Sequence, residues 1–125
     1  YRSLDQLVER GLVRPVGSEP GDAGPDRTVL AATRAGRSRM RTWLRPPVTA
    51  LRDLRSELLL KIALAVRCGV DIGPMLDAQR GRLDEQVATL SAAAFDPSGR
   101  VVDAVALWRH EVACAGQRFL ERLLD

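Results

Sequence analysis

The sequence predicts a mainly α-helical chain in two parts, a helix, β-hairpin and helix over residues 1–45 and a wholly helical segment over residues 46–125. Three observations support this class. Apolar residues recur every three or four positions along most of the chain. A stretch rich in glycine and proline over residues 17–25 separates two short strand-like runs. Pro46-Pro47 then interrupts the helical pattern, because the residue before a proline avoids the α-helical conformation.

The first part begins with a predicted helix over residues 1–11, which ends at Gly11. Residues 12–16 and 27–32 are expected to be the two strands of a hairpin, with Pro15 near a strand end. Thr33 is placed to cap a helix over residues 34–44. The residues expected in the core of this part are Leu4, Leu7, Leu12, Met40 and Trp43.

The second part contains three predicted helices. The first covers residues 48–68 and ends before Gly69, and the second opens at Gly73-Pro74. Asp96 is expected to cap the third, with Pro97 at its first position. The apolar face of the middle helix is formed by Ile72, Leu76, Gln79, Leu83, Val87 and Leu90.

The last helix has more apolar surface than one subunit of this size is expected to cover. One stripe repeats at spacings of four and three residues, and it predicts a dimer interface formed by Val105, Trp108, Val112, Ala115 and Phe119. A second stripe contains Leu120, Leu123 and Leu124. Two apolar stripes serve two neighbours, so we expect a second copy of the chain, in a homodimer, to cover one of them.

Charge differs between the two parts. The formal charge of +3 is the sum of +4 over residues 1–45 and −1 over residues 46–125, and 18 of the 19 basic residues are arginine. Arginine suits contacts with phosphate, although an arginine excess also arises from a GC-rich genome. Aromatic residues make up only 4% of the chain, which argues against a single-strand stacking platform or a carbohydrate-binding face.

The order helix, hairpin, basic helix describes the rear half of a winged helix-turn-helix, in which the first helix enters the major groove and the hairpin touches the backbone. Residues 1–13, YRSLDQLVERGLV, resemble the recognition helix and first wing strand of PadR-family transcriptional regulators. Residues 27–37, RTVLAATRAGR, resemble the family's second wing strand and following turn, and residues 52–61, RDLRSELLLK, its dimerisation helices. MarR-type regulators share the wing features, but the long helical tail favours PadR.

The resemblance implies a sequence-specific repressor that binds double-stranded DNA as a homodimer on an inverted-repeat operator. It implies an incomplete DNA-binding domain over residues 1–45, since two helices are expected before Tyr1, and a dimerisation domain over residues 46–125. Tyr1 and Arg2 would contact bases or phosphates, Ser3 and Gln6 share that face, and Arg27, Arg34 and Arg37 would bind phosphates. Some related regulators bind flat aromatic effectors between subunits, which makes Trp108 a candidate stacking platform.

Other function classes have less support. Cys68, His110 and Cys114 do not form a metal-ligand set, so no metal or cofactor is expected. Paired carboxylates and a nucleophile with its base are missing, so an enzyme is not expected. With two cysteines and no apolar run of membrane-spanning length, we expect a cytoplasmic protein without membrane contact. The alternative kept open is a helical interaction or dimerisation module that does not bind DNA.

Overall fold

The computed structural model describes residues 2–125, and Tyr1 lies outside that range. Helices make up 65% of the chain and accompany one two-stranded antiparallel hairpin, so the mainly helical class is confirmed. The chain divides into two compact units, Tyr1–Trp43 (unit 1) and Leu44–Asp125 (unit 2). Each unit is described by itself below.

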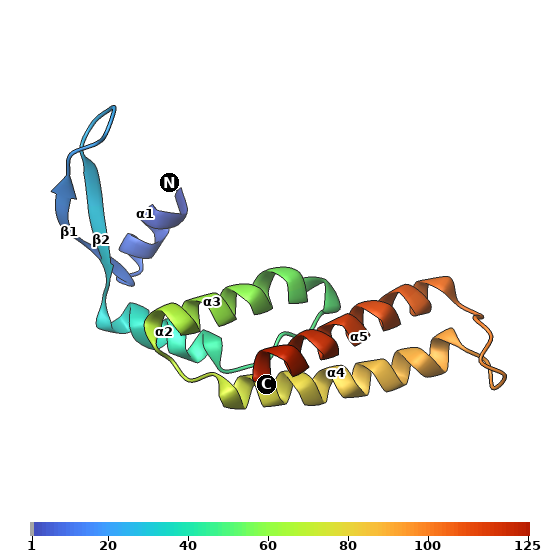
Figure 1. Cartoon of the computed structure of the whole chain (residues 1–125). Helices are drawn as coiled ribbons and strands as arrows, with labels where there is room; N and C mark the ends of the chain where they lie inside the picture. The colour runs from blue at the N-terminus through green and yellow to red at the C-terminus, as the bar shows by residue number, and fades with distance from the viewer. Residues whose placement is uncertain (1) are drawn as a thin grey trace. The chain divides into compact units, whose positions relative to one another are not determined.

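Unit 1 contains α1 (Arg2–Glu9), β1 (Val13–Glu19), β2 (Arg27–Ala32) and all but the last residue of α2 (Arg34–Leu44) (Figure 1). The bounds expected for the second strand and the following helix are confirmed. The first strand does not end at residue 16, as expected, but continues to Glu19. A bulge between Pro15 and Gly17 shifts the register, and pairing then resumes with Gly17 opposite Val29.

Thr33 connects three segments of unit 1. Its hydroxyl donates a hydrogen bond to the Gly11 carbonyl oxygen at 2.6 Å and accepts one from the Gly36 amide at 3.0 Å. Its own amide donates to the Leu12 carbonyl oxygen. The expected cap at the start of α2 is therefore present, and it also holds the end of α1 against α2. Gly36 completes this junction, because a Cβ atom at that position would overlap the Leu12 carbonyl oxygen.

We expect Gly36→Ala to destabilise unit 1 by about 3 kcal/mol, because the backbone must move to relieve the overlap with Leu12. Gly81→Ala is the matched control. Gly81 lies in α4 with open space around its Cβ position, so alanine there should stabilise its helix by about 1 kcal/mol. Hydrogen exchange of the β1 and β2 amides would measure the first effect. Equal protection in the Gly36→Ala variant and the wild type would contradict it.

The side chains of unit 1 remain accessible to solvent. Leu4 is 42% exposed, which corrects its expected place in the core, and Leu7, Leu12, Met40 and Trp43 are half-buried. No side chain between residues 2 and 43 is fully buried. The periodicity of α1 correctly predicts an apolar face, on which Leu4 and Val8 are exposed.

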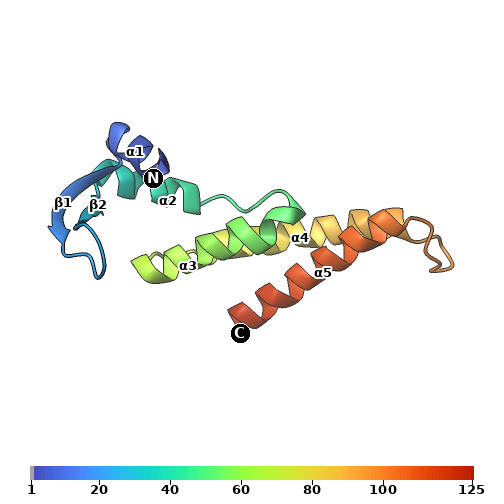
Figure 2. The same ribbon diagram turned by 90° about the horizontal axis from the view of Figure 1, so that it is seen from above.

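Unit 2 is built on a helical hairpin of α4 (Gly73–Ala94) and α5 (Ala104–Leu124), which run antiparallel (Figures 1 and 2). Before it come a 3-10 turn η1 (Leu51–Asp53), a π-helical turn η2 (Leu54–Leu58) and α3 (Leu59–Cys68). The predicted face of α4 is confirmed, with Leu76, Gln79, Leu83 and Leu90 buried. The core continues into the other elements through Val48, Leu58, Ala113 and Leu120.

The single helix expected over residues 48–68 is wrong only at its start. Residues 48–50 are not helical, and η1 and η2 then lead without a break into α3, which begins at Leu59. The cause is non-local: the Gln79 amide accepts a hydrogen bond from the Val48 N–H at 2.7 Å and donates one to the Val48 carbonyl oxygen at 3.0 Å. With both backbone groups of Val48 bonded to Gln79, this segment does not continue the helical hydrogen-bond pattern.

Lys61 holds the same segment from α3. Its buried ammonium donates to the Pro46 carbonyl oxygen at 2.7 Å and lies 3.8 Å from a Glu57 carboxylate oxygen. Burial lowers the pKa of Lys61 below its ordinary value, and the charge of Glu57 offsets part of that change. Lys61 and Gln79 thus fasten residues 46–48 to the helices of unit 2.

We expect Gln79→Leu to lower the free energy of unfolding of unit 2 by about 3 kcal/mol, because the buried N–H and C=O of Val48 lose their partners. Gln86→Leu is the control, since the half-buried Gln86 amide donates only to the Thr49 carbonyl oxygen at 3.2 Å, and its loss should cost less than about 1 kcal/mol. Urea unfolding of both variants measures the difference. Similar values for the two would contradict the role assigned to Gln79.

The predicted start of the last helix is also corrected. The Asp96 carboxylate accepts hydrogen bonds from the backbone amides of Ser98 and Arg100 and so closes a turn. The helix begins seven residues after the expected Pro97, at Ala104, where the Asp103 carboxylate caps the amides of Val105 and Ala106. Over residues 2–125, no helix is long and apolar enough to cross a membrane.

Candidate nucleic-acid interface and apolar groove

Three arginines form a stripe along α2. Arg34, Arg37 and Arg41 are spaced three and four residues apart, so they lie on one face of the helix, and all three are exposed. We call them the arginine stripe. The Arg37 guanidinium donates one hydrogen bond to the Ala32 carbonyl oxygen at 2.9 Å. Because a guanidinium carries five donors, Arg37 retains donors for another acceptor.

The electrostatics of the stripe favour an anion. No acidic residue occurs between residues 28 and 52. Arg34 also stands at the first position of α2, where the positive end of the helix dipole opposes its charge. Like charges on one helix face repel one another unless salt or a bound anion screens them. A phosphate backbone would therefore relieve an unfavourable arrangement.

The predicted base-reading residues of α1 are exposed but have acidic neighbours. Arg2, Ser3 and Gln6 are all exposed; helical spacing places Arg2 and Gln6 opposite Leu4, whereas Ser3 lies next to Leu7 at the edge of the apolar face. Asp5 and Glu9 lie on the same polar side of the helix, so that side has no excess of positive charge. The predicted contact at Tyr1 lies outside the described residues.

Arg27 lies at the end of the hairpin beside acidic side chains. It is paired with Glu19 across the two strands, and its guanidinium lies 3.8 Å from an exposed Asp22 carboxylate oxygen. Exposed ion pairs of this kind are weak, yet the two acids repel phosphate. The structure therefore places Arg27 next to carboxylates, and Arg27 does not belong to the arginine stripe.

Two basic residues were missed as site candidates from the sequence. Arg41 belongs to the arginine stripe, and Arg14 is exposed on β1 opposite Ala31. The signal for Arg41 was present in the sequence, because its spacing from Arg34 and Arg37 places it on their helix face. The position of Arg14 opposite Ala31 could be seen only from the pairing of the two strands.

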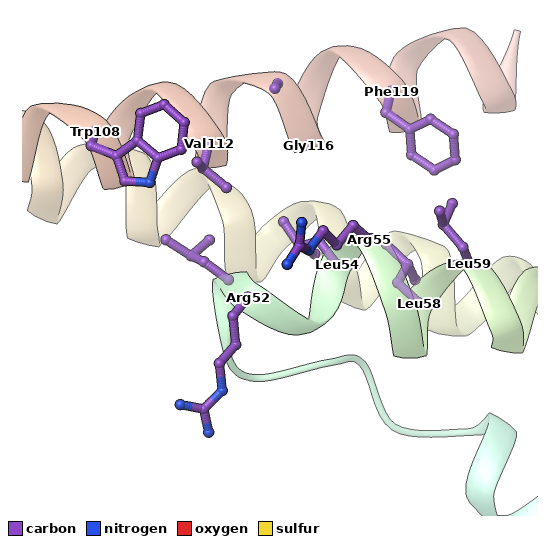
Figure 3. A pocket seen from close by; sticks show the side chains of 11 residues that line it. Arg52, Leu54, Arg55, Leu58, Leu59, Trp108, Val112, Gly116 and Phe119 are labelled. Atoms are coloured by element: carbon purple, nitrogen blue, oxygen red, sulfur yellow. The ribbon is translucent and has the colours of Figure 1, made fainter.

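Unit 2 contains an apolar groove of about 560 Å³ between α5 and the segment formed by η1, η2 and the start of α3 (Figure 3). Trp108 and Phe119 stand at its two ends along α5, with Val112 and Gly116 between them (Figure 3). The opposite wall is supplied mainly by leucines. The complete lining is Leu51, Arg52, Leu54, Arg55, Leu58, Leu59, Trp108, Val112, Ala115, Gly116 and Phe119.

The groove includes most of the predicted dimer stripe. Val105 and Trp108 are 70% and 71% exposed, and Phe119 is 38% exposed. Val112 differs from them, because it is half-buried and packs against the core of its own chain. In the predicted dimer stripe, Trp108 and Phe119 therefore form an exposed rim of the groove. Val112 lies between them and is already packed within unit 2.

The cysteines and the histidine form no metal centre. Within residues 2–125, no three side chains of His, Cys, Asp or Glu are grouped closely enough to hold a metal ion. Cys114 Sγ lies 3.7 Å from the nearer ring nitrogen of His110, and the His110 ring packs edge-on against Phe95. Cys68 is exposed at the end of α3.

Comparison with known proteins adds no assignment, because no family model, curated protein or solved structure matches the chain.

Proposed function

We propose that this protein is a sequence-specific transcriptional regulator of the PadR type, a repressor that binds double-stranded DNA. The observation that carries the proposal is the arginine stripe, which lies in a segment free of acidic residues and directly follows the β-hairpin. The order of α1, the hairpin and α2 supports a winged-helix arrangement, in which the hairpin is the wing. The protein would act in the cytoplasm, where its DNA is.

In this proposal different elements do different work. The arginine stripe binds phosphates and supplies affinity that carries no sequence information. Arg2, Ser3 and Gln6 on α1 contact base edges in the major groove and supply specificity. The acids near Arg27 keep the tip of the wing away from the backbone, so the phosphate contacts concentrate on α2.

Two copies would act together. A second chain that covers the exposed rim of α5 doubles the phosphate contacts and imposes an inverted-repeat operator with half-sites about one helical turn apart. Trp108, which is 71% exposed, offers a contact surface for a small effector that relieves repression.

A second candidate function is an interaction or dimerisation module without DNA binding. The exposed Val105 and Trp108 on α5 favour it, because an apolar surface of this kind needs a partner in either case. The two candidate functions differ in unit 1, which binds DNA in the first and does not in the second.

Fluorescence anisotropy with a labelled fragment from upstream of the protein's own gene tests the proposal. We expect binding that resists unrelated competitor DNA and weakens steeply with salt, with log K falling by about 0.9 for each phosphate contact per tenfold increase in salt. Absent binding, or binding that salt does not change, would leave the interaction module as the better account.

A further inference from the structure

The groove of unit 2 has the properties of a small-molecule site. Its volume of about 560 Å³ falls within the range typical of ligand pockets, which are mostly apolar and contain a few polar groups. Here those groups are two arginines, and every other lining residue is apolar or glycine. One wall includes the π-helical turn η2, a rare conformation that often occurs at functional sites.

The two arginines are directed differently. Figure 3 shows the Arg55 side chain among Leu54, Leu58 and the facing helix, whereas the Arg52 side chain points away from the groove. Within residues 2–125, neither guanidinium takes part in an ion pair or a hydrogen bond. Arg55 thus places an unpaired positive charge beside an apolar surface.

This charge decides between two occupants of the groove. A helix from a second copy that filled the groove with apolar side chains would cover the Arg55 guanidinium, and an unpaired buried charge is costly. An amphipathic anion would pair with it and bury its own apolar part on the leucines. A second copy can still contact the exposed Val105, Trp108 and Phe119 at the rim.

We propose that the groove binds an aliphatic carboxylate, with the carboxylate on Arg55 and the hydrocarbon chain along α5 between Trp108 and Phe119. Trp108 and Phe119 are eleven positions apart on α5, a rise of about 16 Å, and this elongated surface suits an extended chain better than one flat ring. Gly116 lets α5 pack closely beside the groove, because even a Cβ atom there would press against Leu54 and Leu83. Binding itself does not depend on DNA recognition, and only the ligand's role as an effector rests on the proposed function.

Isothermal titration calorimetry with decanoate and decan-1-ol, each below its aggregation limit, tests this proposal without DNA. We expect saturable decanoate binding to the wild type and binding of decan-1-ol that is weaker by roughly tenfold or more, because the alcohol lacks the charge that pairs with Arg55. Arg55→Gln should remove this difference. Arg80→Gln, which makes the same charge change at an exposed position on α4 that does not line the groove, should keep it.

The outcomes are distinct. Weakened decanoate binding in Arg55→Gln but not in Arg80→Gln supports the site. No saturable binding to the wild type, or equal losses in both variants, overturns it and leaves the groove to the second copy. Cinnamate in place of decanoate separates an aromatic carboxylate from an aliphatic one, and tighter binding of cinnamate would overturn the aliphatic assignment.

Discussion

Replacing Phe119 with aspartate is expected to convert a dimer into a monomer. Phe119 is 38% exposed on α5, at one end of the groove, and belongs to the stripe that a second copy is proposed to cover. A carboxylate at that position must be dehydrated without a partner when the two copies meet. A twofold interface contains the substitution twice, so we expect a loss of about 4 kcal/mol, or roughly a 10³-fold weaker dimer.

Sedimentation velocity over a range of concentrations measures this change. Ala93→Asp is the matched control, because Ala93 is exposed on α4, outside the stripe, and gains the same charge. Circular dichroism should show equal helix content in both variants. If Phe119→Asp still sediments as a dimer while retaining its fold, the second copy does not contact this part of α5.

Removing the arginine stripe is the second substitution with a large expected effect. In the triple variant Arg34→Gln, Arg37→Gln and Arg41→Gln, a dimer loses six positive charges that face the proposed backbone contact. We expect DNA affinity to fall by roughly 10²-fold or more at low salt. The slope of log K against log salt should become shallower by about one unit for each phosphate that no longer has an arginine partner.

A triple variant in unit 2 controls for net charge. Arg67→Gln, Arg80→Gln and Arg122→Gln remove three exposed arginines from α3, α4 and α5. A general loss of positive charge would weaken binding in both triple variants, whereas the proposed interface requires loss in the stripe variant alone. Equal affinities for the two variants would refute α2 as the phosphate-binding element.

Local signals predicted much of the fold. The second strand and the helix after it have the bounds expected from the sequence, because a short apolar run followed by a Thr33 cap depends on neighbouring residues. Gly69 ends α3 as predicted, with a φ of 66° that glycine adopts without strain. The face of α4 followed from its apolar spacing.

The error at residues 48–50 occurred where a distant residue decides the conformation. The helical pattern expected there is overridden by Gln79, which bonds the backbone of Val48 from 31 residues away. The error at the start of α5 is local, because Asp96 closes a turn with Ser98 and Arg100, while Asp103 provides the cap. Asp96 and Asp103 are both capable of capping, and the structure shows which of them does.

The candidate sites show the same division. The arginine stripe was largely readable, since helix geometry determines which residues share a face. The contact between Arg27 and Asp22 could not be predicted from the sequence, because it depends on the conformation of the hairpin loop. Only the structure shows that Leu54 and Leu58 line the same groove as Trp108 and Phe119.

By itself, the sequence determined that this protein is mainly helical with one hairpin, and that its basic excess lies in the first part. Periodicity and caps act over a few residues, so they are visible in the chain alone. Only the tertiary structure decided that α1 has an exposed apolar face, that residues 46–48 are held by Lys61 and Gln79, and that Arg55 faces an open groove. Apolar spacing specifies which face of a helix is hydrophobic, whereas what covers that face depends on contacts between residues far apart in the chain.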